Sequence, residues 1–199
     1  MTMSKIAINL LGLLCISQSA FGALMHDGAK YDSAWQQEYV DLGASYNNVV
    51  ALHGQKNDGS WENIGSGVVV GDGDRIVGVA HSALQSNDSV YQQYAVTTGP
   101  NMINDYGDTY YTSEVHVSPN YSGGNAGDLA VWVFEDTLSE ITPATLYCGN
   151  DLDLLGMTVT TVGYGASGFV PEGAGVERAD LITAVVFSMV RWVAGERCA

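Results

Sequence analysis

The fold is decided by residues 65–84, which read GSGVVVGDGDRIVGVAHSAL. Two apolar runs rich in valine, 68–70 and 76–80, flank the sequence GDGD at 71–74. This combination is typical of a β-hairpin with a tight turn. The second run ends directly before His81. A histidine at the end of a buried strand can project into a cleft while the core holds its ring, so His81 is a candidate functional residue.

Asp128 has a similar position later in the chain. It follows glycine-rich sequence at 122–127 and directly precedes the apolar run 129–134. An aspartate at the mouth of a buried strand loses hydration free energy unless its carboxylate is hydrogen-bonded, and an imidazole N–H is a suitable donor. Singly, His81 could be an ordinary core histidine and Asp128 a turn residue. Together they suggest a His–Asp pair.

The rest of the chain is predicted to be mainly β-structure. A short helix is expected to begin at Ser33, where the sequence has the form of a capping box, and to end at Gly43. No alternation of strands and helices follows, which favours an all-β barrel or sandwich. The strand candidates, rich in β-branched and aromatic residues, are 46–53, 64–70, 75–80, 90–97, 110–117, 129–135, 157–164 and 181–193.

The first 22 residues have the features of a secretory signal peptide. Lys5 supplies a positive charge, residues 6–16 are mostly apolar, and Ala20 and Gly22 are small residues where a signal peptidase reads the chain. The apolar run is too short to span a membrane. We therefore expect a secreted protein, extracellular or periplasmic, without a membrane span.

Residues 23–199, the predicted mature domain, contain few groups suited to a metal. Cys148 and Cys198 are enough for one disulfide in an oxidising compartment, but not for a cysteine metal cluster. Asp72 and Asp74 could hold calcium, although turn chemistry explains them without a metal. The sequence therefore predicts no cofactor and leaves calcium binding and the disulfide open.

The charge of the chain excludes one class of function. Seven Lys and Arg residues stand against 22 Asp and Glu residues, which gives a formal net charge of -15. The 102 residues between Arg75 and Arg178 contain no basic side chain other than histidine and 12 acidic ones. A protein that binds nucleic acid by neutralising phosphates needs a basic face. Nucleic acid is therefore not an expected partner.

Four short motifs, in order, resemble the trypsin/chymotrypsin-like serine peptidase family in its bacterial secreted branch. Gly-Ser-Gly at 65–67 looks like the segment before the family's histidine hairpin, and Val-Ala-His-Ser at 79–82 resembles its Ala-Ala-His motif. Residues 118–131 are similar to its His-Pro-x-Tyr and Asp-Ile-Ala-Leu stretch. Thr-Thr-Val-Gly-Tyr-Gly at 160–165 looks like the segment that opens its second barrel.

The resemblance implies a fold, a substrate class and two residue roles. The fold would be an all-β, trypsin-like double β-barrel, and the substrate or ligand would be a protein or peptide. His81 would be the general base, and Asp128 would fix its tautomer and stabilise the imidazolium. The interval 128 − 81 = 47 residues is close to the spacing of about 45 in the chymotrypsin type.

The nucleophile of the family is missing. The 199 residues contain no Gly-Asp-Ser-Gly-Gly, and the family spacing would place the serine at about position 221. Ser122, Ser167 and Ser188 are alternatives, but none has the right position and flanking sequence. We therefore expect a C-terminally truncated domain, with the first barrel complete, the second incomplete and an atypical tail at 181–199. A frameshift is one explanation, and a separate chain could complete the second barrel.

Three functions fit these observations. The first is a secreted trypsin-like serine endopeptidase homologue that retains His81 and Asp128 and is inactive without a nucleophile. The second is a non-catalytic pseudo-peptidase that binds protein. The third is an unrelated acidic β-sandwich binding module in which the motif matches are accidental. The separation of the two side chains distinguishes the third from the others, because only a peptidase-like site requires their hydrogen bond.

Overall fold

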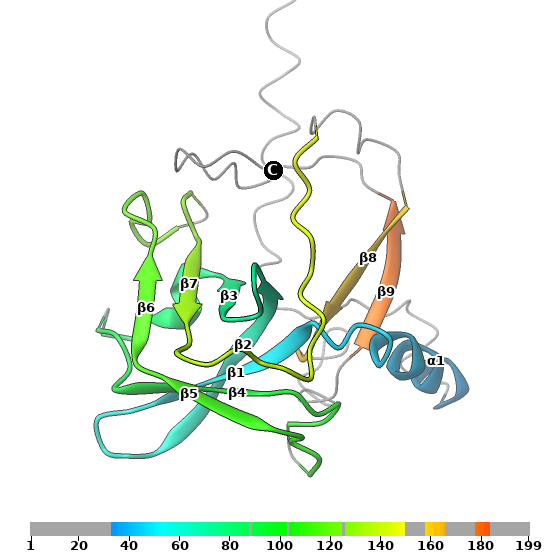
Figure 1. Ribbon diagram of the computed structural model, residues 1–199, viewed down its shortest axis with the longest axis horizontal. Helices are drawn as coiled ribbons and strands as arrows, with labels where there is room; N and C mark the ends of the chain where they lie inside the picture. The colour runs from blue at the N-terminus through cyan, green and yellow to red at the C-terminus, as the bar shows by residue number, and fades with distance from the viewer. Residues whose placement is uncertain are drawn as a thin grey trace, which may run out of the picture.

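The computed structural model describes residues 33–87, 89–102, 104–124, 126–149, 158–165 and 178–183. The predicted signal peptide, Ser167, Ser188, Cys198 and most of the predicted tail at 181–199 lie outside this part of the chain. The regular secondary structure of the described part is mainly β-strand, with one α-helix, α1 (Ser33–Gly43), and a 3₁₀ turn at Ala80–Ala83 (Figure 1).

Seven antiparallel strands form one curled sheet in the order β5-β4-β1-β2-β3-β7-β6 (Figure 1). The strands that end this order, β5 and β6, are separated in sequence only by Ser113, so the sheet must curl back on itself. The bounds are β1 (Val49–Gln55), β2 (Trp61–Val70), β3 (Arg75–Gly78), β4 (Gln93–Thr97), β5 (Thr109–Thr112), β6 (Glu114–Val117) and β7 (Ala130–Val133).

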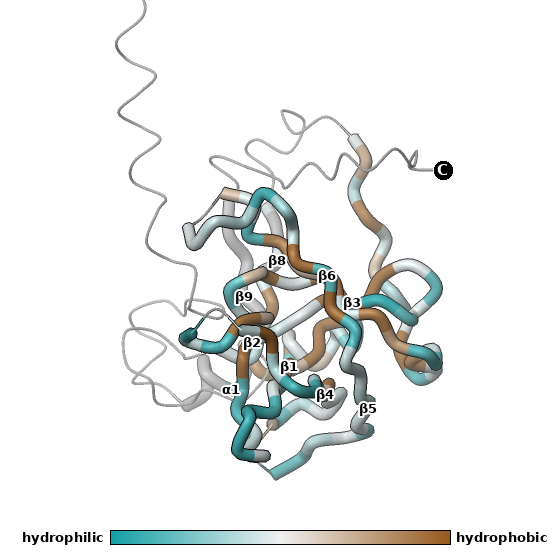
Figure 2. Tube along the Cα trace, turned by 90° about the vertical axis from the view of Figure 1, so that its left-hand side faces the viewer, coloured by the Kyte–Doolittle hydropathy of each residue, from teal (hydrophilic) through white to brown (hydrophobic). Residues whose placement is uncertain are grey.

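The main hydrophobic core is built by alternate residues of these strands. In a strand, every second side chain points to the same face, so a half-buried sheet supplies one apolar side chain in two. Figure 2 shows apolar stretches along the central strands, whereas hydrophilic ones lie mostly at the loops. The largest fully buried side chains of the core cluster are Trp132, Tyr94, Leu52, Ile76, Leu138, Val50, Val69 and Val96.

A second, two-stranded sheet lies beside the first. It pairs β8 (Thr158–Gly163) with β9 (Arg178–Thr183), and α1 lies against β9 (Figure 1). Tyr164, next to β8, is buried, and its N–H donates to Ser66 Oγ at 2.9 Å. Its hydroxyl donates to the Gly99 carbonyl at 3.0 Å. These contacts attach the end of β8 to the curled sheet.

The structure confirms the predicted helix and corrects several strand boundaries. The predicted strand at 110–117 is two strands, because the Thr112 hydroxyl donates to the Val133 carbonyl and accepts the Glu114 N–H, which turns the chain at Ser113. Of the predicted strand at 181–193, the structure describes only residues 181–183. These belong to β9, which begins at Arg178, three residues before the predicted start.

Gly67 allows β2 and β3 to approach closely. A Cβ atom at this position would lie 2.4 Å from Ile76 Cγ2 and 3.1 Å from Leu52 Cδ1, and both of these side chains are fully buried. We expect Gly67→Ala to lower the free energy of unfolding by about 1–3 kcal/mol, because a packed core resists an added methyl group.

Urea unfolding measures this loss. Gly124→Ala is the control, because a Cβ at Gly124 has no neighbour within 4 Å. The control should change the free energy of unfolding by less than about 0.5 kcal/mol. Equal unfolding midpoints for Gly67→Ala and the control would contradict the close packing at Gly67.

Candidate active site

His81 lies in the 3₁₀ turn Ala80–Ala83, not at the end of a strand as the sequence suggested. β3 ends at Gly78, and Val79 is still extended before the chain turns. The Ser82 N–H then donates to the Val79 carbonyl at 3.2 Å. Both alanines of the turn are fully buried, which fixes the backbone, whereas the His81 side chain is 40% exposed. The buried alanines therefore hold the backbone of the turn in place, while the imidazole of His81 faces solvent.

Asp128 lies two residues before β7, and the glycine that precedes it allows a close backbone contact. Gly127 has φ +68°, and a Cβ there would lie 2.6 Å from the backbone carbon of Asn120. Only glycine fits this conformation and this space without strain. The Leu129 carbonyl accepts the Ser118 N–H at 2.8 Å, which holds the loop closed. Asp128 is thereby fixed with its side chain only 12% exposed.

The pairing of β3 with β7 brings the two residues together. Gly78 is opposite Ala130 in this antiparallel pair. His81 is three residues after Gly78, and Asp128 is two residues before Ala130, so both lie beyond the same end of the pair. The pairing therefore places two residues that are 47 positions apart in sequence at the same end of these two strands.

Asp128 holds His81 at two points. Its Oδ2 lies 2.7 Å from His81 Nδ1, and its Oδ1 accepts the backbone N–H of His81 at 2.9 Å. An ionised carboxylate can only accept hydrogen bonds, so Nδ1 is the protonated nitrogen when it contacts Oδ2. In the neutral ring, Nε2 then carries the free lone pair. This is the arrangement that a general base requires.

The Gly-Ser-Gly segment at 65–67 supports the turn that carries His81. Gly65 has φ +142°, and a Cβ there would lie 3.2 Å from the Ser82 hydroxyl. The next residue, Ser66, accepts the Tyr164 N–H. A larger residue at Gly65 would be strained and would press on the turn, which explains physically why glycine suits this motif.

The other candidate site in the sequence was the turn at 71–74. It is a tight turn between β2 and β3, with φ +64° at Gly71 and φ +86° at Gly73. Asp74 lies near Arg75, with 3.9 Å between Oδ1 and the guanidinium. Over the described ranges, no group of three metal-binding side chains comes together. Among the helices of the same ranges, none is long and apolar enough to cross a membrane.

Comparison with known proteins shows the fold. No protein-family model matches the sequence, and no curated protein matches it. The scabies mite inactivated protease paralogue S-I1 is 18% identical, with a TM-score of 0.52 over 70% of this chain and 61% of that chain. HL collagenase is 15% identical (TM-score 0.50; 70% and 59% covered), and protease Anisep from Arthrobacter nicotinovorans is 13% identical (0.51; 69% and 64%).

The fold is that of trypsin-like serine proteases. At these identities the likeness extends to the fold alone, and the chain spans 59–64% of the length of the three structures. Over the described residues, the seven strands curl into a half-barrel with a small two-stranded sheet beside it, so the β-sandwich of the third hypothesis is not observed there. The completeness of each barrel stays a prediction.

Proposed function

We propose that this chain is a homologue of secreted trypsin-like serine endopeptidases in which His81 and Asp128 form the catalytic His–Asp pair. The observation that supports this role is the two-point contact between them, at 2.7 Å and 2.9 Å. In this role, His81 Nε2 takes the proton of a serine hydroxyl as it attacks a peptide carbonyl, and returns it to the leaving amine. Asp128 holds the ring and stabilises the imidazolium.

We further propose that residues 1–199 alone do not hydrolyse peptide bonds. They contain no Gly-Asp-Ser-Gly-Gly, the segment that carries the nucleophile in the chymotrypsin-like family. Loss of the serine from such a triad lowers the rate by about a million-fold. The His–Asp pair would then act only with a serine supplied by another segment or chain.

A non-catalytic role in binding protein is the second candidate. It is favoured by the combination of an intact His–Asp contact with the missing serine motif. One structure with this fold is described as an inactivated protease paralogue, so the fold also occurs in a protein without protease activity. In this role, the exposed face of His81 would lie in a surface that contacts a peptide without cleaving it.

A fluorophosphonate probe tests the proposed inactivity. Such a probe reacts rapidly with a serine whose hydroxyl is activated by a base, whereas an ordinary serine hydroxyl is a weak nucleophile. We expect no labelling of the purified chain, under conditions in which an active trypsin-like protease is labelled completely. His81→Ala is the matched control. Labelling of the wild type that disappears in this variant would reveal a nucleophile and contradict the proposed inactivity.

A further inference from the structure

Tyr94, a fully buried residue of β4, contacts the turn that carries His81. Its hydroxyl donates to the carbonyl of Ala83, the last residue of that turn, at 2.6 Å. The same hydroxyl accepts the N–H of Tyr91 at 3.3 Å. One buried hydroxyl thus acts as donor and acceptor between two backbone segments. Its removal would take a partner from a buried carbonyl, which is costly.

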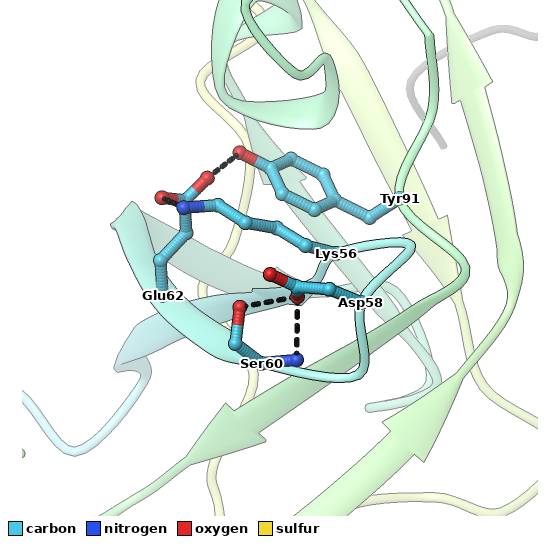
Figure 3. Close-up of polar contacts among 5 residues, drawn as sticks. All are labelled: Lys56, Asp58, Ser60, Glu62 and Tyr91. Carbon is cyan, nitrogen blue, oxygen red and sulfur yellow. Dashed lines mark hydrogen bonds and ion pairs between the residues drawn. The ribbon is translucent and has the colours of Figure 1, made fainter.

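Tyr91 is itself held by an ion pair at the surface. Its hydroxyl donates to Glu62 Oε1 at 2.5 Å, and Glu62 also pairs with Lys56 (Figure 3). Burial and the bond to Glu62 raise the pKa of Tyr91, so the phenol keeps its proton. The contacts with Lys56 and Tyr91 lower the pKa of Glu62. Asp58 accepts from Ser60 and closes the loop between β1 and β2 (Figure 3).

The ring of Tyr94 reaches the strand that follows Asp128. It packs edge-to-face against Trp132 of β7, with ring centroids 5.8 Å apart, and against Tyr91 at the same distance. Trp132 is four residues after Asp128. Tyr94 therefore contacts both halves of the site, the turn of His81 through its hydroxyl and the strand after Asp128 through its ring.

We infer that Tyr94 is a positioning residue that holds the His81 turn in register with Asp128. The inference rests on the proposed function, in which the 2.7 Å contact between His81 and Asp128 must persist for proton transfer. A reacting pair needs support from side chains that are themselves locked by packing and hydrogen bonds. Tyr94 meets both conditions, and the ion pair of Lys56 and Glu62 secures its neighbour Tyr91.

Exchange of the His81 Nδ1 proton with water measures this positioning. A ring proton held by a carboxylate resonates far downfield, and it exchanges only when the hydrogen bond opens. Tyr94→Phe keeps the ring and removes the hydroxyl. We expect the exchange rate of this proton to rise about five- to tenfold, because loss of one buried hydrogen bond shifts an opening equilibrium by about that factor.

Tyr164→Phe is the matched control. It also removes a buried tyrosine hydroxyl that donates to a backbone carbonyl, that of Gly99. It should lower the stability of the chain without changing the exchange of the His81 proton. An unchanged rate in Tyr94→Phe, or an equal rise in both variants, would overturn the positioning role. A wild type without the downfield proton would instead contradict the proposed His–Asp pair, and with it the role of Tyr94.

A second variant applies if Tyr94→Phe does not fold. Glu62→Gln changes a partly exposed side chain and keeps its size, but it replaces the charged acceptor of the Tyr91 hydroxyl with a neutral one. Charge-assisted hydrogen bonds are stronger than neutral ones, so this variant weakens the bond that holds Tyr91. Because only part of this loss reaches Tyr94, we expect a small rise, of about twofold, in the exchange rate of the His81 proton. An unchanged rate in this variant would then overturn the inference.

Discussion

Replacing Trp132 with alanine is expected to lower the free energy of unfolding by about 3–5 kcal/mol, the range found when a buried aromatic side chain is truncated. Trp132 is fully buried in β7 and packs against the ring of Tyr94. It also fills the space over Gly78, where a Cβ would lie 2.8 Å from the indole. The cavity left by alanine would lie between these residues and would not close without moving β3.

Trp61→Ala is the control for this loss. Trp61 is 40% exposed and packs edge-to-face against Tyr111 at 5.9 Å, on the outside of the sheet. Its truncation should cost only about 1 kcal/mol, since it loses one aromatic contact and little buried area. Circular dichroism should be used to follow denaturant unfolding, because both variants remove a tryptophan and therefore change the fluorescence signal itself. Equal losses in the two variants would contradict the central packing of Trp132.

Asp128→Ala is expected to lower the free energy of unfolding by about 2–4 kcal/mol, because it removes two hydrogen bonds to one charged acceptor. Both bonds hold His81, one through its backbone N–H and the other through its ring. The Asp128 side chain is nearly buried, so in the alanine variant water cannot easily take its place as the acceptor of these two hydrogen bonds. The turn that carries His81 should become mobile as a result.

Glu114→Ala separates this effect from the loss of an ordinary ion pair. Glu114 Oε1 lies 2.9 Å from His116 Nε2, but the two side chains are 58% and 66% exposed. Exposed pairs of this kind contribute little, so we expect a change below about 0.5 kcal/mol. If Asp128→Ala costs no more than Glu114→Ala in the same chemical unfolding experiment, then Asp128 does not anchor the His81 turn.

The sequence predicts those parts of the fold that depend on local signals. Helix α1 ends at Gly43, and the turn between β2 and β3 has glycines with positive φ at Gly71 and Gly73, as their positions in the sequence indicate. The pairing of His81 with Asp128 is also predicted, because His81 follows one apolar run, Asp128 precedes another, and the flanking motifs resemble those of trypsin-like peptidases. Their contact as a hydrogen-bonded pair is observed, whereas their catalytic role remains a proposal.

Features that depend on tertiary contacts cannot be predicted from the sequence in this way. The break at Ser113 arises because the Thr112 hydroxyl reaches the Val133 carbonyl, 21 positions later in the chain. The role of Tyr94 depends on where the Ala83 carbonyl lies after the sheet has curled. From the sequence alone, Tyr94 is one of eleven tyrosines, and packing is an adequate explanation for it.

The proton NMR spectrum of the wild-type chain, compared with that of Asp128→Ala, tests the central claim most directly. If His81 donates its Nδ1 proton to Asp128, the wild type shows a resonance of this proton far downfield of the amide region. This resonance should be absent in Asp128→Ala and unchanged in Glu114→Ala. A wild-type spectrum without the resonance, or a resonance that persists in Asp128→Ala, would contradict the His–Asp pair on which the proposed function depends.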